Sequence, residues 1–208
     1  MITLDTEELS RAVGCSLETA EQWVGPLNEA MEAFAIWSLE RQAGFLGQIA
    51  HESRGLRVLE EDLNYTATRL RKVWPTRFPT DDMALMYAHN PEKLGNYVYA
   101  NRFGNGDVAS GDGYRFRGRG PLMLTFKDNY REISMGLLHN ERLVEYPDHV
   151  AWDNLTGASA AARYWYTRGC NDLADQLDWE GISRKINGGR IGLEDRIART
   201  EHALEVLA

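Results

Sequence analysis

Helical hydrophobic patterns account for most of the regular sequence, and strand-like alternation of apolar and polar residues is scarce. A chain of this kind buries its apolar side chains by packing helices against one another, because a half-buried strand requires the alternating pattern. The helical patterns cover residues 6–13, 16–23, 27–52, 156–168 and 193–207. The sequence therefore predicts a mainly α-helical fold.

Two of these segments differ in how they are expected to pack. Segment 156–168 has little polar surface, so we expect a central, buried helix. Segment 193–207 is amphipathic, with Arg196 and other charged residues on the rest of its surface. Its core-facing side is expected to consist of Leu193, Ile197, Leu204 and Leu207.

A turn-rich stretch at residues 74–121 separates the helical parts and contains four prolines and seven glycines. We expect one catalytic domain, residues 1–208, with a smaller lobe or cleft wall at about 60–117 inserted between the helical parts. Two Gly- and Asp-containing pieces, 104–107 and 111–114, lack the ligand spacing and closing Glu of a calcium-binding EF-hand loop. They are expected to form tight turns without a metal ion.

Charge and composition exclude several classes of function. The net charge is −8, and residues 1–62 carry 12 acidic against 4 basic side chains, whereas residues 63–208 carry 19 of each. Nucleic acid is not an expected partner, because phosphate binding needs a basic domain or stripe. Cys15 and Cys170 lack any zinc-ligand spacing, so we expect no cofactor or structural metal. Neither a signal peptide nor a membrane-spanning stretch is recognisable, so no membrane insertion is expected.

Glu52 and Glu61 are the two carboxylates with the most distinctive settings. Glu52 ends an apolar helical pattern, and Gly55 is suited to stop that helix. The helix dipole and partial burial would there favour the neutral carboxyl group that a general acid requires. Glu61 lies in the acidic run 60–62 and is expected to be exposed and ionised, as a general base requires. Paired carboxylates of this kind are typical of glycosidases.

Both carboxylates also have an ordinary structural interpretation, since helix-terminal Glu residues and acidic runs commonly form solvated surface. The nine-residue spacing is compatible with the separation of about 6.5–9.5 Å found in inverting glycosidases and with the ~5–5.5 Å of retaining ones. Stereochemistry therefore does not follow from the residues themselves.

Three separate stretches occur in an order and spacing typical of one known family: Ala50-His51-Glu52-Ser53, Gly118-Arg119-Gly120-Pro121-Leu122-Met123-Leu124-Thr125 with Asn129-Tyr130, and Ile186-Asn187-Gly188-Gly189. Over residues 36–205 the chain resembles glycoside hydrolase family 19, which comprises chitinases and related peptidoglycan-cleaving enzymes. Segments 59–65 and 101–120 are most similar to the phage endolysins of that family. The resemblance implies a lysozyme-like, two-lobed helical fold with a substrate cleft between the lobes.

The same resemblance implies roles for individual residues. Glu52 would be the general acid, Glu61 the general base, and Thr125 would help to hold the attacking water in an inverting reaction. The residues expected to bind substrate or order the cleft are Arg119, Asn129, Asn187 and Tyr65. Arg119 alternatively braces a buried loop by pairing with a carboxylate, and Asn187 alternatively serves as a turn residue.

Met123 departs from the family pattern, which commonly has Gln at this position, two residues before the water-holding Ser or Thr. Methionine forms no strong hydrogen bond, so this residue favours peptidoglycan over chitin as the substrate. The leading interpretation is a phage-type endolysin that cuts the β-1,4 bonds between N-acetylmuramic acid and N-acetylglucosamine. The alternatives are a chitinase, a lytic transglycosylase in which Glu61 is dispensable, and a glycan-binding module without turnover.

An endolysin of this type is expected to act as a monomer on peptidoglycan glycan strands. We expect it to accumulate in the host cytoplasm and to reach the cell wall through a membrane lesion made by another protein.

Overall fold

The structure is a computed structural model that describes residues 3–208. Its helices, in chain order, are α1 (Thr6–Val13), α2 (Leu17–Ala33), α3 (Leu39–Glu52), α4 (Ala67–Val73), α5 (Asp81–Leu85), α6 (Pro91–Val98), the 3-10 helix η1 (Val108–Ser110), α7 (Asp112–Arg115), α8 (Lys127–Leu138), α9 (Arg142–Glu145), α10 (His149–Trp152), α11 (Asn154–Thr167), α12 (Cys170–Asp175), α13 (Trp179–Asn187) and α14 (Leu193–Leu207). Over residues 3–208, β-pairing is limited to isolated antiparallel bridges that join Arg119 to Glu60 and to Leu124. The prediction of a mainly α-helical fold is confirmed.

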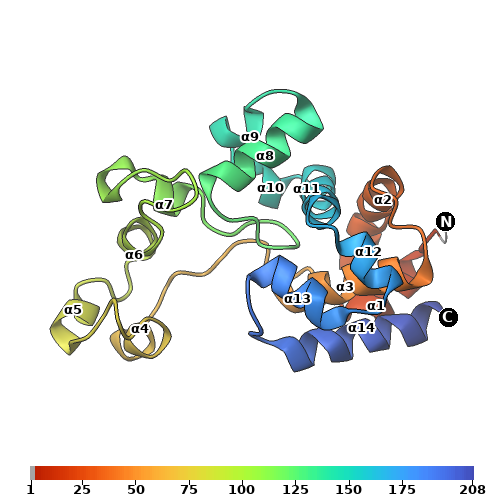
Figure 1. Cartoon of the computed structure of the whole chain (residues 1–208), viewed down its shortest axis with the longest axis horizontal. Helices are drawn as coiled ribbons and strands as arrows, with labels where there is room; N and C mark the ends of the chain where they lie inside the picture. Colours follow the sequence, from red (N-terminus) through yellow and green to blue (C-terminus); the bar gives the residue numbers. More distant parts are fainter. Residues whose placement is uncertain (1–2) are drawn as a thin grey trace.

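Helix α3 forms the centre of the larger lobe and is surrounded by α1, α12, α13 and α14, with α2 and α11 packed together beside them (Figure 1). Every residue of α3 from Gln42 to Ala50 is buried. Gly47 allows the backbones of α3 and α14 to come close, because a Cβ atom at this position would lie 2.8 Å from the Cα atom of Thr200. The core of this lobe therefore reaches as far as Ala50, directly before the end of α3.

A smaller lobe lies at the opposite end of the molecule and contains α4 to α7 (Figure 1). It has its own apolar cluster, which is built from residues between Leu63 and Tyr114. Aromatic rings dominate this cluster; Phe78, for example, packs edge-on against Tyr87 with ring centroids 5.5 Å apart. Extended segments before α4 and after α7 connect this lobe to the rest of the chain (Figure 1).

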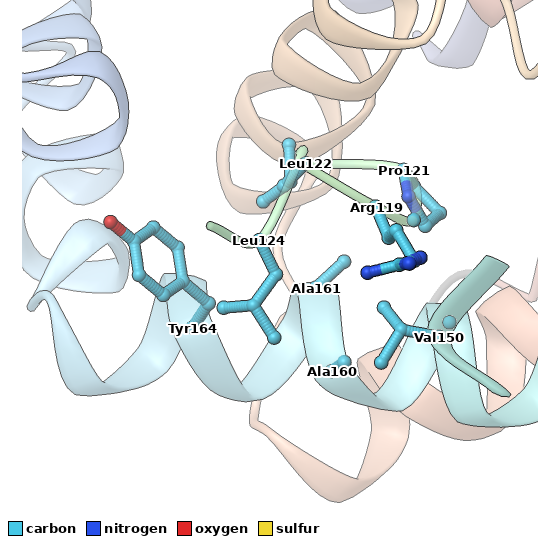
Figure 2. A pocket seen from close by; sticks show the side chains of 10 residues that line it. Arg119, Pro121, Leu122, Leu124, Val150, Ala160, Ala161 and Tyr164 are labelled. Atoms are coloured by element: carbon cyan, nitrogen blue, oxygen red, sulfur yellow. The ribbon is translucent and has the colours of Figure 1, made fainter. Parts of the chain in front are cut away.

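The loop at residues 119–124 contributes to two apolar clusters, one in the larger lobe and one beside it. Leu122 belongs to the cluster of the larger lobe, whereas Leu124 belongs to a third cluster formed largely by α8, α9 and α10. Figure 2 shows Leu122 above α11 and the side chain of Leu124 reaching down to this helix beside Ala161. The space enclosed under this loop is only about 10 Å³, which is too small to admit a ligand. The loop is therefore firmly packed on α11.

Two of the predicted helices have different limits in the structure. Helix α2 does not stop near residue 23 but continues through Pro26 to Ala33. Proline lacks the N–H group that would bind the carbonyl of Gln22, and Asn154 supplies a donor instead, with Nδ2 3.1 Å from that oxygen. The predicted helix 27–52 is in fact divided, because the chain turns between Ala33 and Leu39, with Ala35 at a φ of 56°.

The buried face of α14 also differs from the prediction, although the limits of this helix agree with it. The buried residues are Arg196, Thr200, Ala203 and Leu207, whereas Leu193, Ile197 and Leu204 are only partly buried. The close approach of α3 at Gly47 favours small side chains on the contact face of α14. Arg196 is buried there because it pairs with a carboxylate, as described below.

Candidate active site

Glu52 lies at the C-terminal end of α3 because the chain turns sharply after it. The hydroxyl of Ser53 donates to the carbonyl of Ile49 at 2.6 Å and accepts the N–H of Leu56 at 2.8 Å. Gly55 follows with a φ of 68°, and a Cβ atom there would lie 2.8 Å from the carbonyl oxygen of Val13. The helix ends at Glu52, Arg54 takes a left-handed φ of 53°, and the N–H of Gly55 donates to the carbonyl of Ala50 at 3.0 Å. Gly55 itself is needed for the close approach to Val13.

Arg196 holds the carboxylate of Glu52 from α14. Its guanidinium lies 2.6 Å from Glu52 Oε1 and donates a second bond of 2.6 Å to the side-chain oxygen of Gln48. The Arg196 side chain is 3% exposed and that of Glu52 is 17% exposed. A guanidinium at this distance stabilises a carboxylate, so burial and the helix dipole are not the only influences on Glu52. Arg196 is thus a partner of Glu52 that the sequence did not predict.

Glu60 and Glu61 point to opposite sides of an extended segment that pairs with residues 118–119. The N–H of Glu61 donates to the carbonyl of Gly118 at 2.9 Å, and the N–H of Gly118 donates to Glu61 Oε2 at 3.2 Å. Glu60 Oε1 instead accepts bonds of 2.8 Å from both Arg117 and Arg119. The alternation of an extended backbone thus separates a carboxylate bound by two arginines from one that faces a groove.

Tyr99 provides the second hydrogen bond to Glu61, with its phenol oxygen 2.5 Å from Oε1. Burial raises the pKa of Tyr99 well above its ordinary value, and the negative charge of Glu61 raises it further. The phenol therefore stays protonated and remains a donor throughout the neutral and mildly alkaline range. Each carboxylate oxygen of Glu61 retains a further lone pair for a water molecule.

Glu52 and Glu61 line the same depression on the molecular surface. One part, with a volume of about 430 Å³, is lined by both carboxylates together with Tyr65, Gly118 and Thr125. A second part, of about 800 Å³, also contains Glu52 and Thr125 in its walls and extends along α8, α11 and α13. Since the two parts share wall residues, they form one groove, and we call it the catalytic groove. A groove with this combined volume is suited to a polymer rather than a single small molecule.

Thr125 lies beside Glu61, with Gly118 packed between them. A Cβ atom on Gly118 would lie 3.3 Å from Thr125 Oγ1 and 3.4 Å from Glu61 Cβ. The Thr125 hydroxyl donates to the carbonyl of Met123 at 2.8 Å, and this bond leaves its oxygen lone pairs directed elsewhere. The structure therefore brings Thr125 and Glu61 together across Gly118, where a Cβ atom would be in tight contact with the Thr125 hydroxyl.

Asn129 and Asn187 both line the catalytic groove but are held differently. Asn129 donates to the carbonyl of Thr125 at 2.7 Å and accepts from Arg168 at 3.1 Å, so it connects two groove walls. Asn187 donates to the carbonyl of Ile191 at 2.8 Å and accepts the N–H of Gly189 at the same distance. The amide of Asn187 thus holds the turn that follows it in the chain, and this agrees with the role of a turn residue that the sequence left as an alternative.

Arg119 is the one predicted substrate contact that lies outside the walls of the catalytic groove. Its side chain is 2% exposed and bridges Glu60 at 2.8 Å and Asp148 at 2.6 Å. It also donates to the carbonyl of Arg115 at 2.7 Å. These bonds make Arg119 a brace for the 119–124 loop, which is the structural alternative that the sequence left open, and a contact of Arg119 with substrate stays a prediction.

Several groove residues were not found by sequence reasoning. Tyr99 and Arg196 contact the two carboxylates, whereas Arg168 and Lys185 add positive charge to the groove walls. Arg196 carried a signal, because its position places it on the same helical face as Thr200, Ala203 and Leu207. No sequence pattern indicates a contact between Tyr99 and Glu61, because this hydrogen bond depends on how the smaller lobe folds.

The catalytic groove contains carboxylates and hydrogen-bond donors but no evident metal site. Among residues 3–208, no group of three or more His, Cys, Asp or Glu side chains is arranged to hold a metal ion. In the same part of the chain, no helix has both the length and the apolar character needed to span a membrane.

The two-lobed helical fold, with paired carboxylates in a groove, defines a lysozyme-like glycoside hydrolase. A protein from Haemophilus influenzae described as a glycosyl hydrolase family 19 domain-containing protein is 40% identical over 156 residues, which are 75% of this chain and 74% of that protein. The chain therefore belongs to glycoside hydrolase family 19. A shorter similarity, 38% identity over 53 residues, relates 26% of this chain to 21% of an acidic 26 kDa endochitinase from Solanum lycopersicum.

Solved structures show the same fold. A bacterial family 19 chitinase superposes with a TM-score of 0.66 at 17% sequence identity, covering 100% of this chain and 96% of that one. Chitinase C from Streptomyces griseus superposes with a TM-score of 0.64 at 16% identity, covering 99% of this chain and 76% of that one. No family model matches the sequence. The expected lysozyme-like two-lobed fold is thus confirmed.

Proposed function

We propose that this glycoside hydrolase is a phage-type endolysin that cleaves the β-1,4 bonds between N-acetylmuramic acid and N-acetylglucosamine in bacterial peptidoglycan. The choice of polymer rests on the charge of one part of the catalytic groove, the part with a volume of about 800 Å³. Arg102 and Lys185 line it, whereas its carboxylates Glu52 and Glu132 are paired with Arg196 and Arg168. Peptidoglycan carries carboxylates on its stem peptides, whereas chitin carries none, so the positive wall suits peptidoglycan.

In the proposed reaction, Glu52 protonates the glycosidic oxygen and Glu61 removes a proton from the attacking water. Arg196 stabilises the carboxylate that Glu52 becomes after it has given up its proton. Tyr99 and the N–H of Gly118 fix the orientation of Glu61, and Thr125 lies beside it to hold the water. The water then attacks from the face opposite the leaving group, so the product has the inverted anomeric configuration.

A chitinase is the second candidate, and the names of the tomato endochitinase and of the solved chitinases favour it. Met123 counts against chitin, because it lines both parts of the groove at the position where the family commonly has Gln, and methionine cannot form that hydrogen bond to substrate. A lytic transglycosylase would need only one of the two carboxylates, and a glycan-binding module would need neither.

The test is a mass-spectrometric analysis of products from purified peptidoglycan and from chitin. Wild type, Glu52→Gln and Glu61→Gln are compared, with Glu194→Gln as a control at an exposed site on α14. We expect reducing N-acetylmuramic acid ends from peptidoglycan, a loss of about 10²–10⁴-fold in rate for each of the two groove variants, and no loss for the control.

Other outcomes would contradict the proposal in distinct ways. Faster turnover of chitin would assign the chitinase, and reducing N-acetylglucosamine ends would move the cut to the other bond. Anhydro ends with an active Glu61→Gln variant would assign the transglycosylase, and binding without cleavage would assign the glycan-binding module.

We also propose that the enzyme acts as a monomer at the host cell wall. In this scheme it accumulates in the cytoplasm and is released by a membrane lesion. Fractionation of infected cells before and after lysis tests this part separately, since early release without a lesion would contradict it.

A further inference from the structure

A second pocket lies outside the catalytic groove and has two exposed aromatic rings at its edge. Its volume is about 430 Å³, and its walls come from residues 114–119 and 145–152. Trp152 is 75% exposed and Tyr146 is 57% exposed. A tryptophan left in water forgoes a large gain from burial, so the fold itself does not require Trp152 to be aromatic.

The pocket is directly behind the wall that carries Glu61. Along the extended segment 117–119, Gly118 lines the catalytic groove, whereas Arg117 and Arg119 line the second pocket. Glu60 and Glu61 alternate in the same way, with Glu60 bound to the two arginines. A ligand in the second pocket would therefore be held on the opposite side of this wall from the cleaved bond.

The floor of the pocket is fixed before any ligand binds. Arg119, which is 2% exposed, joins Asp148 at 2.6 Å and thereby ties the segment before α10 to the wall. Arg115 donates bonds of 3.0 Å to the carbonyls of Val144 and Glu145. Tyr146 packs against His149 with ring centroids 5.9 Å apart, so the ring orientation is also restricted. A rigid pocket of this kind loses little conformational entropy on binding.

We propose that this pocket is a secondary binding site for a glycan strand of the aminosugar polymer, with Trp152 and Tyr146 as stacking surfaces. Flat, exposed aromatic rings contact the apolar faces of sugar rings, while the polar groups beside them, including those of Arg117 and His149, bind hydroxyl and acetamido groups. The site would hold the enzyme on an insoluble polymer while another strand is cut.

This inference rests on the proposed function only in requiring an aminosugar polymer, so its test uses both candidate polymers. The full-length Glu52→Gln enzyme, with and without Trp152→Ala or Tyr146→Ala, is co-sedimented with insoluble peptidoglycan and with insoluble chitin. The matched control is Trp37→Ala, a second tryptophan that is 53% exposed and lies between α2 and α3. We expect each pocket variant to bind the polymer about tenfold more weakly, with wild-type affinity for the control.

The same substitutions in the active enzyme separate the two sites. Turnover of short soluble glycans should stay at the wild-type rate, while the rate on insoluble polymer falls by about the same factor as the binding. Unchanged polymer binding in both pocket variants would overturn the inference, as would an equal loss in Trp37→Ala. Weaker binding to chitin alone would support the secondary site while contradicting peptidoglycan as the substrate. Wild-type melting temperatures would exclude misfolding as the cause.

Discussion

Tyr99 is the residue that most directly controls the geometry of Glu61. Its phenol donates the 2.5 Å bond to Oε1, and its ring packs edge-on against Phe126 at 5.3 Å, so the ring stays in place without the hydroxyl. We predict that Tyr99→Phe lowers kcat by about tenfold with little change in KM, because a hydrogen bond to a charged group contributes about 1.5–3 kcal/mol.

The measurement is steady-state turnover of whichever polymer the wild type cleaves. Tyr87→Phe is the control, because Tyr87 packs in the aromatic cluster of the smaller lobe against Tyr97, at 4.7 Å between ring centroids. An unchanged kcat in Tyr99→Phe would show that Gly118 alone suffices to orient Glu61. A loss shared with Tyr87→Phe would point to the stability of the lobe instead.

At the scale of helices, the contact between α3 and α14 connects packing to catalysis, since these helices carry Glu52 and Arg196. We predict that Gly47→Ala lowers the free energy of unfolding by about 2–3 kcal/mol, as overpacking does. Its Cβ would lie 2.8 Å from backbone atoms of Thr200, which can move only if α14 moves. Gly44→Ala, in the same helix, meets side-chain atoms, namely ring atoms of Trp165 and Trp179 at 3.1 Å and Cδ1 of Ile182 at 3.7 Å, and should cost less.

Urea denaturation of both variants tests this ranking, because the gain in helix propensity is the same for both. Gly47→Ala should also lose activity under conditions where it is fully folded, since a displaced α14 moves Arg196 away from Glu52. Equal stability of the two variants would mean that the interface accommodates a methyl group.

The elements that sequence could predict are those whose causes are local. The end of α3 lies within a few residues of Gly55, so the position of Glu52 at the end of its helix was predictable from this local signal. Helix α2 was cut short in the prediction because the donor that compensates for Pro26 comes from Asn154, far along the chain. The burial of Arg196 likewise depends on a partner in another helix. Local sequence patterns thus place Glu52 at the end of its helix, whereas contacts between distant residues determine that Arg196 binds it.

The molecule as a whole places Glu52 on the core of the larger lobe and ties Glu61 to the smaller lobe through Tyr99. The groove walls come from both lobes and from the 119–124 loop, so no single segment contains the site. Which of Glu60 and Glu61 faces the groove was undecidable from the acidic run alone. Pairing with residues 118–119 decides it, and this pairing exists only in the folded chain.

The stability of the whole chain should fall at alkaline pH, and Cys170 provides a way to measure one contribution. Burial raises the pKa of its thiol from 9.0 to about 12, despite the opposing effect of Lys185. Between these values the unfolded chain has lost the thiol proton while the folded chain retains it. The contribution is therefore complete below pH 9, and it declines by about 1.4 kcal/mol per pH unit until pH approaches 12.

We predict that the difference in unfolding free energy between wild type and Cys170→Ala shrinks with this slope above pH 9, because other alkaline effects cancel in the difference. Urea denaturation at steps between pH 8 and about 11 measures it, under reducing conditions that keep both cysteines free. Cys15→Ala should give a shallower slope, because the Cys15 thiol is only partly buried and the charge of Arg57 opposes the rise in its pKa. A difference that does not depend on pH would show that the Cys170 thiolate is accommodated in the folded core.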